Sequence, residues 1–224
     1  MTPDENDQDS ISEALVACLE ATSTVSLCVT AKPDEELERA LSAHCSRSGG
    51  KMTIARSPRR TEDFNQLKGA DAWLLPDLHN YYTAYHQIHG LSAMCRKAGK
   101  PLLLFVPHLQ GSIRWRDFYR WDECIPAEWR HEIEQVRLDA GPQFNEPMFA
   151  ASHEGGLRNG VVTALHDACD ELIEMGVPVV EGHVAALAGL SVIFDNTASW
   201  AAALSSELLR FRDDPLRSRH RHGS

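Results

Sequence analysis

The feature that most constrains the fold is a short apolar run, Leu-Leu-Leu-Phe-Val at Leu102–Val106, which is bounded by Lys100-Pro101 and Pro107. The run does not alternate between apolar and polar residues, so a strand formed here has no face turned to water. Burial on both faces is typical of a parallel sheet that is covered by helices. We therefore expect this run to be a central strand of an α/β sheet.

Other apolar or β-branched runs alternate with segments of helical length. The further expected strands are Thr24–Val29, Lys51–Ala55, Ala72–Leu75, Val177–Val180 and Leu190–Phe194. The expected helices are Ile11–Ala21, one that opens at Pro33 and stops at Gly49-Gly50, Asn80–Lys97, Ala127–Leu138, Asn159–Met175 and Ser199–Phe211. This repetition predicts an α/β fold with a three-layer, Rossmann-like (flavodoxin-like) parallel sheet and helices on both faces.

Length and composition limit the organisation and the partners. The 224 residues suffice for one domain, which we place at residues 10–212, after a flexible leader at 1–9 and before a polar tail at 213–224. A net charge of -10 argues against nucleic acid as a partner, because a phosphate backbone requires a positive protein face. Scattered cysteines without a Cys-x-x-Cys pair, and no run near the roughly 18 apolar residues of a membrane span, predict a cytoplasmic protein that does not enter membranes.

The ligand site is expected beyond the carboxyl ends of the strands, near a switch in strand order. Those ends are predicted at Thr30–Pro33, Arg56–Pro58, Pro76–Asn80, Pro107–Ser112 and Glu181–His183. Two of these segments carry the most chemistry. Pro76–Asn80 precedes a helix whose free amides are expected to form an anion site. Pro107–Ser112 offers the ring nitrogens of His108, the amide of Gln110 and a hydroxyl.

A family resemblance covers about Gly69–Trp115. The segment Ala70-Asp71-Ala72-Trp73-Leu74-Leu75-Pro76, followed by Asn80 and a helix that reaches Gly90-Leu91, resembles flavoproteins related to phosphopantothenoylcysteine decarboxylase. Their pattern is Ala-Asp, an apolar strand, Pro-Ala-Ser-Ala-Asn-Thr and a helix ending near Gly-Ile. Their next element is Lys-Pro, a strand, Pro-x-Met-Asn and a tryptophan. Here it is matched by Lys100-Pro101, the strand, Pro107–Gln110 and Trp115.

The resemblance implies an FMN-binding flavoprotein that forms a homo-oligomer, a trimer or higher. It also implies a lyase, decarboxylase-like or flavin-modifying, that acts on a small-molecule or peptide-like substrate. In this carry-over Asn80 faces the substrate or the phosphate, and the loop Pro107–Gln110 covers the substrate. The implied cofactor-binding residues are Thr30, Pro76, His79, Asn80, Pro107 and Gln110.

Three side chains are candidates for catalysis: His108, Asp63 and Glu154. His108 is chosen because imidazole exchanges protons near neutral pH. Glu154 belongs to the glycine-rich segment Ser152–Gly160, which is either an anion-binding loop or a connection that ends in a helix cap. No metal site is predicted, since the histidines His79, His86 and His89 are interpreted as surface or interface residues.

Two alternatives to the flavoprotein hypothesis stay open. The acidic turn Lys32–Glu36 stands where the family has a Gly/Ser-rich turn for the flavin phosphate, which favours a cofactor-free binding or assembly subunit on the same fold. The other alternative is an enzyme that acts on a nucleotide or sugar phosphate, with Glu154 or Asp63 as its carboxylate. The chain has no Gly-x-Gly-x-x-Gly, Walker loop or Gly-x-Ser-x-Gly elbow, which counts against dinucleotide, nucleoside triphosphate and serine hydrolase chemistry.

Overall fold

A six-stranded sheet with strand order β2-β1-β3-β4-β9-β8 forms the centre of the computed structural model. The structure describes residues 5–58, 61–107, 117–120, 125, 131, 133–136, 148–151, 158–184 and 189–212. The strands of this sheet are β1 (Ser26–Val29), β2 (Lys51–Ile54), β3 (Ala72–Leu74), β4 (Leu103–Pro107), β8 (Val179–Val184) and β9 (Leu190–Asp195). The first four strands run parallel, whereas β9 is antiparallel to both of its neighbours, β4 and β8.

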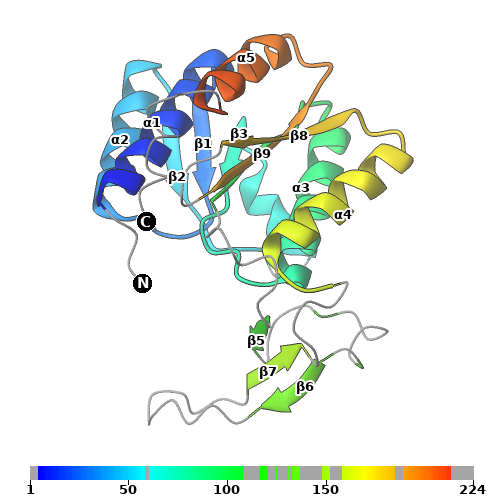
Figure 1. Cartoon of the computed structure of the whole chain (residues 1–224). Coiled ribbons are helices and arrows are strands. Elements are labelled where there is room, and N and C mark those ends of the chain that lie inside the picture. The colour runs from blue at the N-terminus through cyan, green and yellow to red at the C-terminus, as the bar shows by residue number, and fades with distance from the viewer. Residues whose placement is uncertain are drawn as a thin grey trace.

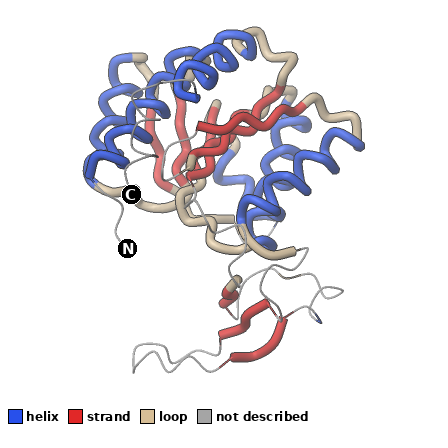
Figure 2. Tube along the Cα trace, in the orientation of Figure 1, coloured by secondary structure: helices blue, strands red, loops and turns tan. Residues whose placement is uncertain are grey.

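Helices cover both faces of the sheet (Figures 1 and 2). One face carries α1 (Glu5–Ala21), α2 (Glu35–Arg47) and α5 (Ala201–Arg212), and the other carries α3 (Tyr81–Ala98), α4 (Val161–Glu174) and the 3-10 helix η1 (Thr61–Leu67). Strand β4 shows why both faces are covered. Leu103 and Phe105 pack in the core on the side of α1, α2 and α5, while Leu104 and Val106 pack in the core on the side of α3, α4 and η1. The three-layer Rossmann-like α/β fold predicted from the sequence is confirmed.

The sheet differs from the prediction in being mixed rather than wholly parallel. An apolar run such as the one in β9 looks the same in either direction, so strand direction is not visible in the sequence. Since β9 and β8 form an antiparallel pair, Glu181–His183 lies within β8 and not beyond its end. The prediction of a strand end at that segment is wrong.

A second, three-stranded antiparallel sheet has the order β5-β7-β6 and lies below the main sheet in Figure 1. It contains β5 (Phe118–Arg120), β6 (Ile133–Val136) and β7 (Met148–Ala151). The helix predicted over Ala127–Leu138 is therefore wrong at Ile133–Val136, where the backbone pairs with β7. Helical spacing is a local signal, and pairing with a distant strand overrides it.

The first helix starts earlier than the sequence predicts. Helix α1 begins at Glu5, inside the segment 1–9 that the sequence suggests is a leader. The predicted tail at 213–224 lies outside the described residues. Within the described ranges, no helix combines the length and the apolar character needed to cross a membrane.

Capping residues mark the ends of α2 and α3. Asp34 caps α2, because its Oδ1 accepts hydrogen bonds from the amides of Glu36 and Leu37 at 3.1 and 2.9 Å. Asn80 caps α3 by accepting from the Thr83 amide at 2.9 Å. Helix α3 ends at Gly99, whose φ of 63° is a left-handed conformation that glycine adopts without strain.

Candidate functional site

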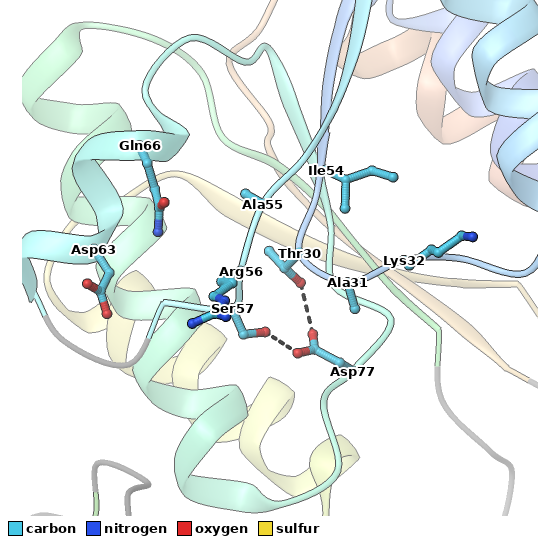
Figure 3. A pocket seen from close by; sticks show the side chains of 10 residues that line it. All are labelled: Thr30, Ala31, Lys32, Ile54, Ala55, Arg56, Ser57, Asp63, Gln66 and Asp77. Carbon is cyan, nitrogen blue, oxygen red and sulfur yellow. Dashed lines mark hydrogen bonds between the residues drawn. The ribbon is translucent and has the colours of Figure 1, made fainter.

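A pocket of about 650 Å³ opens at the carboxyl ends of β1 and β2 (Figure 3). The chain passes from β1 to β2 on one side and then returns to β3 on the other side of β1, so the strand order reverses at this place. Open α/β sheets bind ligands at such a switch point. The position of the pocket therefore agrees with the general prediction that the ligand lies beyond the strand ends.

Asp77 organises the wall of this pocket. Its Oδ1 accepts a hydrogen bond of 2.9 Å from the Thr30 hydroxyl, and its Oδ2 accepts one from the Ser57 hydroxyl, as the dashed lines in Figure 3 show. Thr30 follows β1, Ser57 follows β2 and Asp77 follows β3, so one carboxylate joins the ends of three strands. These bonds hold the three loops together.

The pocket wall also carries two cations, a second carboxylate and an amide. Lys32, Arg56 and Gln66 are exposed, and Asp63 is half-buried. Figure 3 shows Arg56 beside Ser57, whereas the Lys32 amino group extends away from the Asp77 carboxylate. Both cations line the pocket, and Arg56 lies nearer to its polar wall than the amino group of Lys32, which extends away from it.

The apolar part of the pocket is formed by Ile54 together with Ala31 and Ala55. Ile54 is 45% exposed, although it ends a strand of the sheet. Figure 3 shows the Ile54 and Ala55 side chains on opposite sides of the strand, so Ile54 provides the exposed apolar surface on which a flat ring can pack. Removal of that surface from water would favour binding by about 25 cal/mol for each Å².

Helix η1 is held in place by an unusual contact with α3. Phe64, 5% exposed, lies over Gly90, where an added Cβ atom would be 2.1 Å from the Phe64 ring. The ring also meets His86 edge to face, with 5.6 Å between the centroids. Because Phe64 lies between Asp63 and Gln66 in η1, this packing sets where those two side chains enter the pocket.

The structure brings only some of the predicted site residues together. Thr30 and Asp63 line the pocket with Asp77. Of the other described candidates, none lines it: these are Pro76, His79, Asn80 and Pro107. Asn80 is fully buried and donates to the Phe118 carbonyl at 3.1 Å, while the Nδ1 of exposed His79 lies 2.8 Å from the Asp77 carbonyl oxygen. The remaining candidates, His108, Gln110 and Glu154, lie outside the described residues.

The anion site predicted at the start of α3 is occupied by the protein itself. Asp117, just before β5, accepts hydrogen bonds at Oδ2 from the Tyr81 amide at 2.7 Å and from the Gly160 amide at 2.9 Å. Only 5% of Asp117 is exposed, and this burial raises the pKa of its carboxyl, against the opposing effect of the two amides. The expectation of free amides at α3 is therefore wrong, because a carboxylate 36 residues further along the chain binds there.

Several pocket residues lie in the predicted strand-end segments but were not predicted as site residues. Lys32 and Arg56 belong to two of those segments, and Asp77 belongs to a third. Their common signal is the position just after a buried run. What the sequence lacked was the order of the strands, which makes the ends of β1, β2 and β3 neighbours.

Histidines and carboxylates also meet outside the pocket. His86 contacts Phe64 of η1 and His89 lies beside Glu171 of α4, and burial lowers the pKa of both histidines. Because these contacts lie within the chain, the interpretation as surface or interface residues stays a prediction. A different group, His166, Glu181 and His183, places one potential metal-binding atom from each residue within 4.8 Å of the others. In the sequence, the only sign of these three residues as a group is the spacing of Glu181 and His183, which lie two residues apart in one strand.

In comparisons with known proteins, no protein-family model matches this chain, and no curated protein is significantly similar to it in sequence. The resemblance of residues 69–115 to the flavin-dependent decarboxylases therefore stays a prediction. The fold and the geometry of the pocket are the basis for the function proposed below.

Proposed function

We propose that this chain binds a phosphorylated small molecule with a flat ring, of which FMN is the first to test, in the pocket at the β1/β3 switch point. The observation that carries the proposal is the combination of Arg56 with exposed Ile54 where the strand order reverses. The volume of about 650 Å³ falls within the roughly 300–1,000 Å³ common for small-molecule sites.

Each part of the pocket has a role in this proposal. Arg56 binds the phosphate, since a guanidinium donates two parallel hydrogen bonds to phosphate oxygens. Ile54 packs against the ring. Gln66 and Asp63 hydrogen-bond the polar groups between ring and phosphate. The start of α2 takes no part, because Asp34 caps its amides and its first turn is acidic.

A second candidate function is an enzyme that acts on a nucleotide or sugar phosphate. The half-buried carboxylate of Asp63 on the pocket wall favours it, because such a group can accept a proton or bind sugar hydroxyls. The cofactor-free assembly subunit is favoured by the acidic first turn of α2. A cytoplasmic location and a homo-oligomer remain predictions for all three functions.

The test is a titration of the full chain with FMN, in which binding is measured by the quenching of flavin fluorescence. AMP and ribose 5-phosphate are the competitors. Arg56→Ala is expected to raise the Kd for FMN about 10- to 100-fold, because a hydrogen bond to a charged group contributes about 1.5–3 kcal/mol. Lys51→Ala, which removes an exposed cation from β2 outside the pocket, is the matched control and leaves the Kd within about twofold.

The outcomes separate the candidates. Quenching that disappears in Arg56→Ala and persists in Lys51→Ala supports the flavin proposal. Binding of AMP or ribose 5-phosphate without binding of FMN, measured by thermal shift, replaces it with the nucleotide or sugar phosphate function. No binding of any of the three by the wild-type chain rejects both and leaves the assembly subunit.

A further inference from the structure

Three side chains with metal-binding atoms meet between β8 and α4. Glu181 and His183 are two residues apart in β8, so they share the face on which α4 packs, and α4 carries His166. The Nε2 atom of His166 is 3.7 Å from Glu181 Oε2, and that of His183 is 3.4 Å from Glu181 Oε1. One carboxylate thus lies between two imidazole rings.

The two distances from the histidine nitrogens to the nearer Glu181 oxygens are close to those between ligands that share one ion, and all three ligand atoms lie within 4.8 Å of one another. Two atoms bound to zinc at about 2.0–2.1 Å and at a tetrahedral angle are roughly 3.3–3.4 Å apart. The His183–Glu181 distance meets this value, and the His166–Glu181 distance needs a small rotation of one side chain. The histidine side chains are about half exposed and have room to rotate, whereas that of Glu181 is only 13% exposed.

Ser191 orients two of these ligands from the neighbouring strand. It is fully buried, pairs directly with His183 in the β8–β9 ladder, and places its hydroxyl 2.9 Å from the Nδ1 of that ring. The same hydroxyl hydrogen-bonds the Glu181 carboxylate. A hydroxyl that donates to the carboxylate accepts from Nδ1–H, which leaves the lone pair on Nε2. Metal-binding histidines are commonly oriented in this way through their second nitrogen.

The lone pair on Nε2 of His183 then faces the carboxylate oxygen Oε1. Oε1 is buried and has no hydrogen-bond partner among the residues that the structure describes. Two lone pairs that face each other at 3.4 Å repel, unless a cation lies between them. The geometry therefore has a place for a positive ion.

We propose that His166, Glu181 and His183 bind a divalent transition-metal ion, with zinc as the ion that best fits. Two imidazole nitrogens and one carboxylate suit zinc, whereas magnesium and calcium prefer oxygen ligands alone. Three protein ligands leave a tetrahedral position for water or for an exogenous ligand. The site lies on β8, at the edge of the sheet opposite β2, so it does not depend on the proposed FMN pocket.

The test is zinc titration of the chelator-treated full chain against a chromogenic zinc indicator, repeated with Co²⁺, whose absorption spectrum reports tetrahedral coordination. One equivalent is expected to bind per chain. His166→Ala and Glu181→Gln are each expected to weaken binding by about 100-fold or more and to remove the Co²⁺ spectrum. Ser191→Ala, which keeps all three ligands, is expected to weaken binding about 10- to 100-fold.

Two controls separate this site from other histidines. His89→Ala removes a ring whose Nε2 is 3.5 Å from Glu171 Oε2 but which belongs to no three-ligand group among the described residues, so zinc binding is expected to stay unchanged. Substitution of His220 and His222 by alanine tests the histidines of the tail. The proposal is overturned if wild-type protein binds no zinc, or if the tail variant loses binding while Glu181→Gln retains it.

Discussion

Gly90 lies inside α3, where alanine would favour the helix by about 1 kcal/mol. Its lack of a side chain is explained by the Phe64 ring, which occupies the space that a Cβ atom would take. Since Phe64 belongs to η1, the glycine in one element sets the position of Asp63 and Gln66 in another. A single missing methyl group thus contributes to the shape of the pocket.

Gly90→Ala is expected to lower the free energy of unfolding by about 1–2 kcal/mol. Forcing a methyl group into a packed core costs about 1–3 kcal/mol, and an approach of 2.1 Å to the Phe64 ring places the cost in the upper part of that range, about 2–3 kcal/mol. The gain in helix propensity offsets about 1 kcal/mol of it. Urea denaturation measures the change. Adding Phe64→Leu relieves the clash, so the double variant should lose less than the sum of the single losses. Unchanged or increased stability of Gly90→Ala contradicts the explanation.

At the scale of elements, Asp117 joins parts of the fold that are distant in sequence. Its carboxylate accepts from the first amide of α3, from the Gly160 amide before α4, and from the Tyr119 hydroxyl at 3.2 Å. The Asp117 amide in turn donates to the Asn159 side chain at 2.8 Å. Asp117 therefore fixes the small sheet to the starts of two helices, alongside the hydrogen bond from Asn80 to the Phe118 carbonyl.

Asp117→Ala is expected to destabilise the protein by about 2–4 kcal/mol, because two buried amides lose their acceptor and each unpaired group costs about 1–3 kcal/mol. Asp34→Ala is the matched control: it removes an exposed cap from one helix and should cost about 1 kcal/mol. Urea denaturation of both variants checks the difference. Equal losses would show that Asp117 acts as an ordinary cap.

The elements themselves could largely be predicted from the sequence. Five strands of the main sheet coincide with apolar or β-branched runs, whereas β8 overlaps its predicted run only at Val179 and Val180. Asn80 and Gly99 mark the ends of α3 as such residues usually do. Strand direction and the small sheet could not be predicted. Both depend on pairing between distant segments, as at Ile133–Val136, where helical spacing pointed to the wrong structure.

At the scale of the whole molecule, the pH dependence of stability is expected to reflect His86 and His89. Burial lowers the pKa of both side chains from the ordinary value of 6.5. The charge of His89 lowers the pKa of His86 further, while Asp63 acts in the opposite direction on His86 and Glu171 on His89. Above pH 6.5 both imidazoles are mostly neutral in the folded and in the unfolded chain. Below pH 6.5 the imidazoles of the unfolded chain bind protons more readily than those of the folded chain, so the free energy of unfolding decreases as the pH falls.

His86→Phe keeps an aromatic ring against Phe64 and removes one of these titrations. Between pH 7 and 5 the free energy of unfolding of the wild-type protein is expected to fall by about 1 kcal/mol more than that of the variant, since a difference of one bound proton contributes about 1.4 kcal/mol per pH unit. Urea denaturation at several pH values measures both curves. Parallel curves would show that His86 titrates alike in the two states.

The candidate pocket depends on the strand order of the whole sheet. The strand ends that form the pocket were each recognisable, but only the order β2-β1-β3 makes Thr30, Ser57 and Asp77 neighbours. Asp117 likewise reaches α3 from 36 residues away. The sequence predicts which residues follow the strand ends, whereas the strand order determines which of these residues are neighbours.

The packing of the first helix on the last has a consequence for synthesis on the ribosome. Helices α1 and α5 contribute to the same core, and β9 fills the place between β4 and β8 only after residue 190 has been made. Until then the nascent chain leaves the apolar face of α1 and the edge of β4 uncovered. The main sheet is thus expected to finish folding only once β9 and α5 have left the ribosome, and until then the chain is a natural client for chaperones that shield apolar surface.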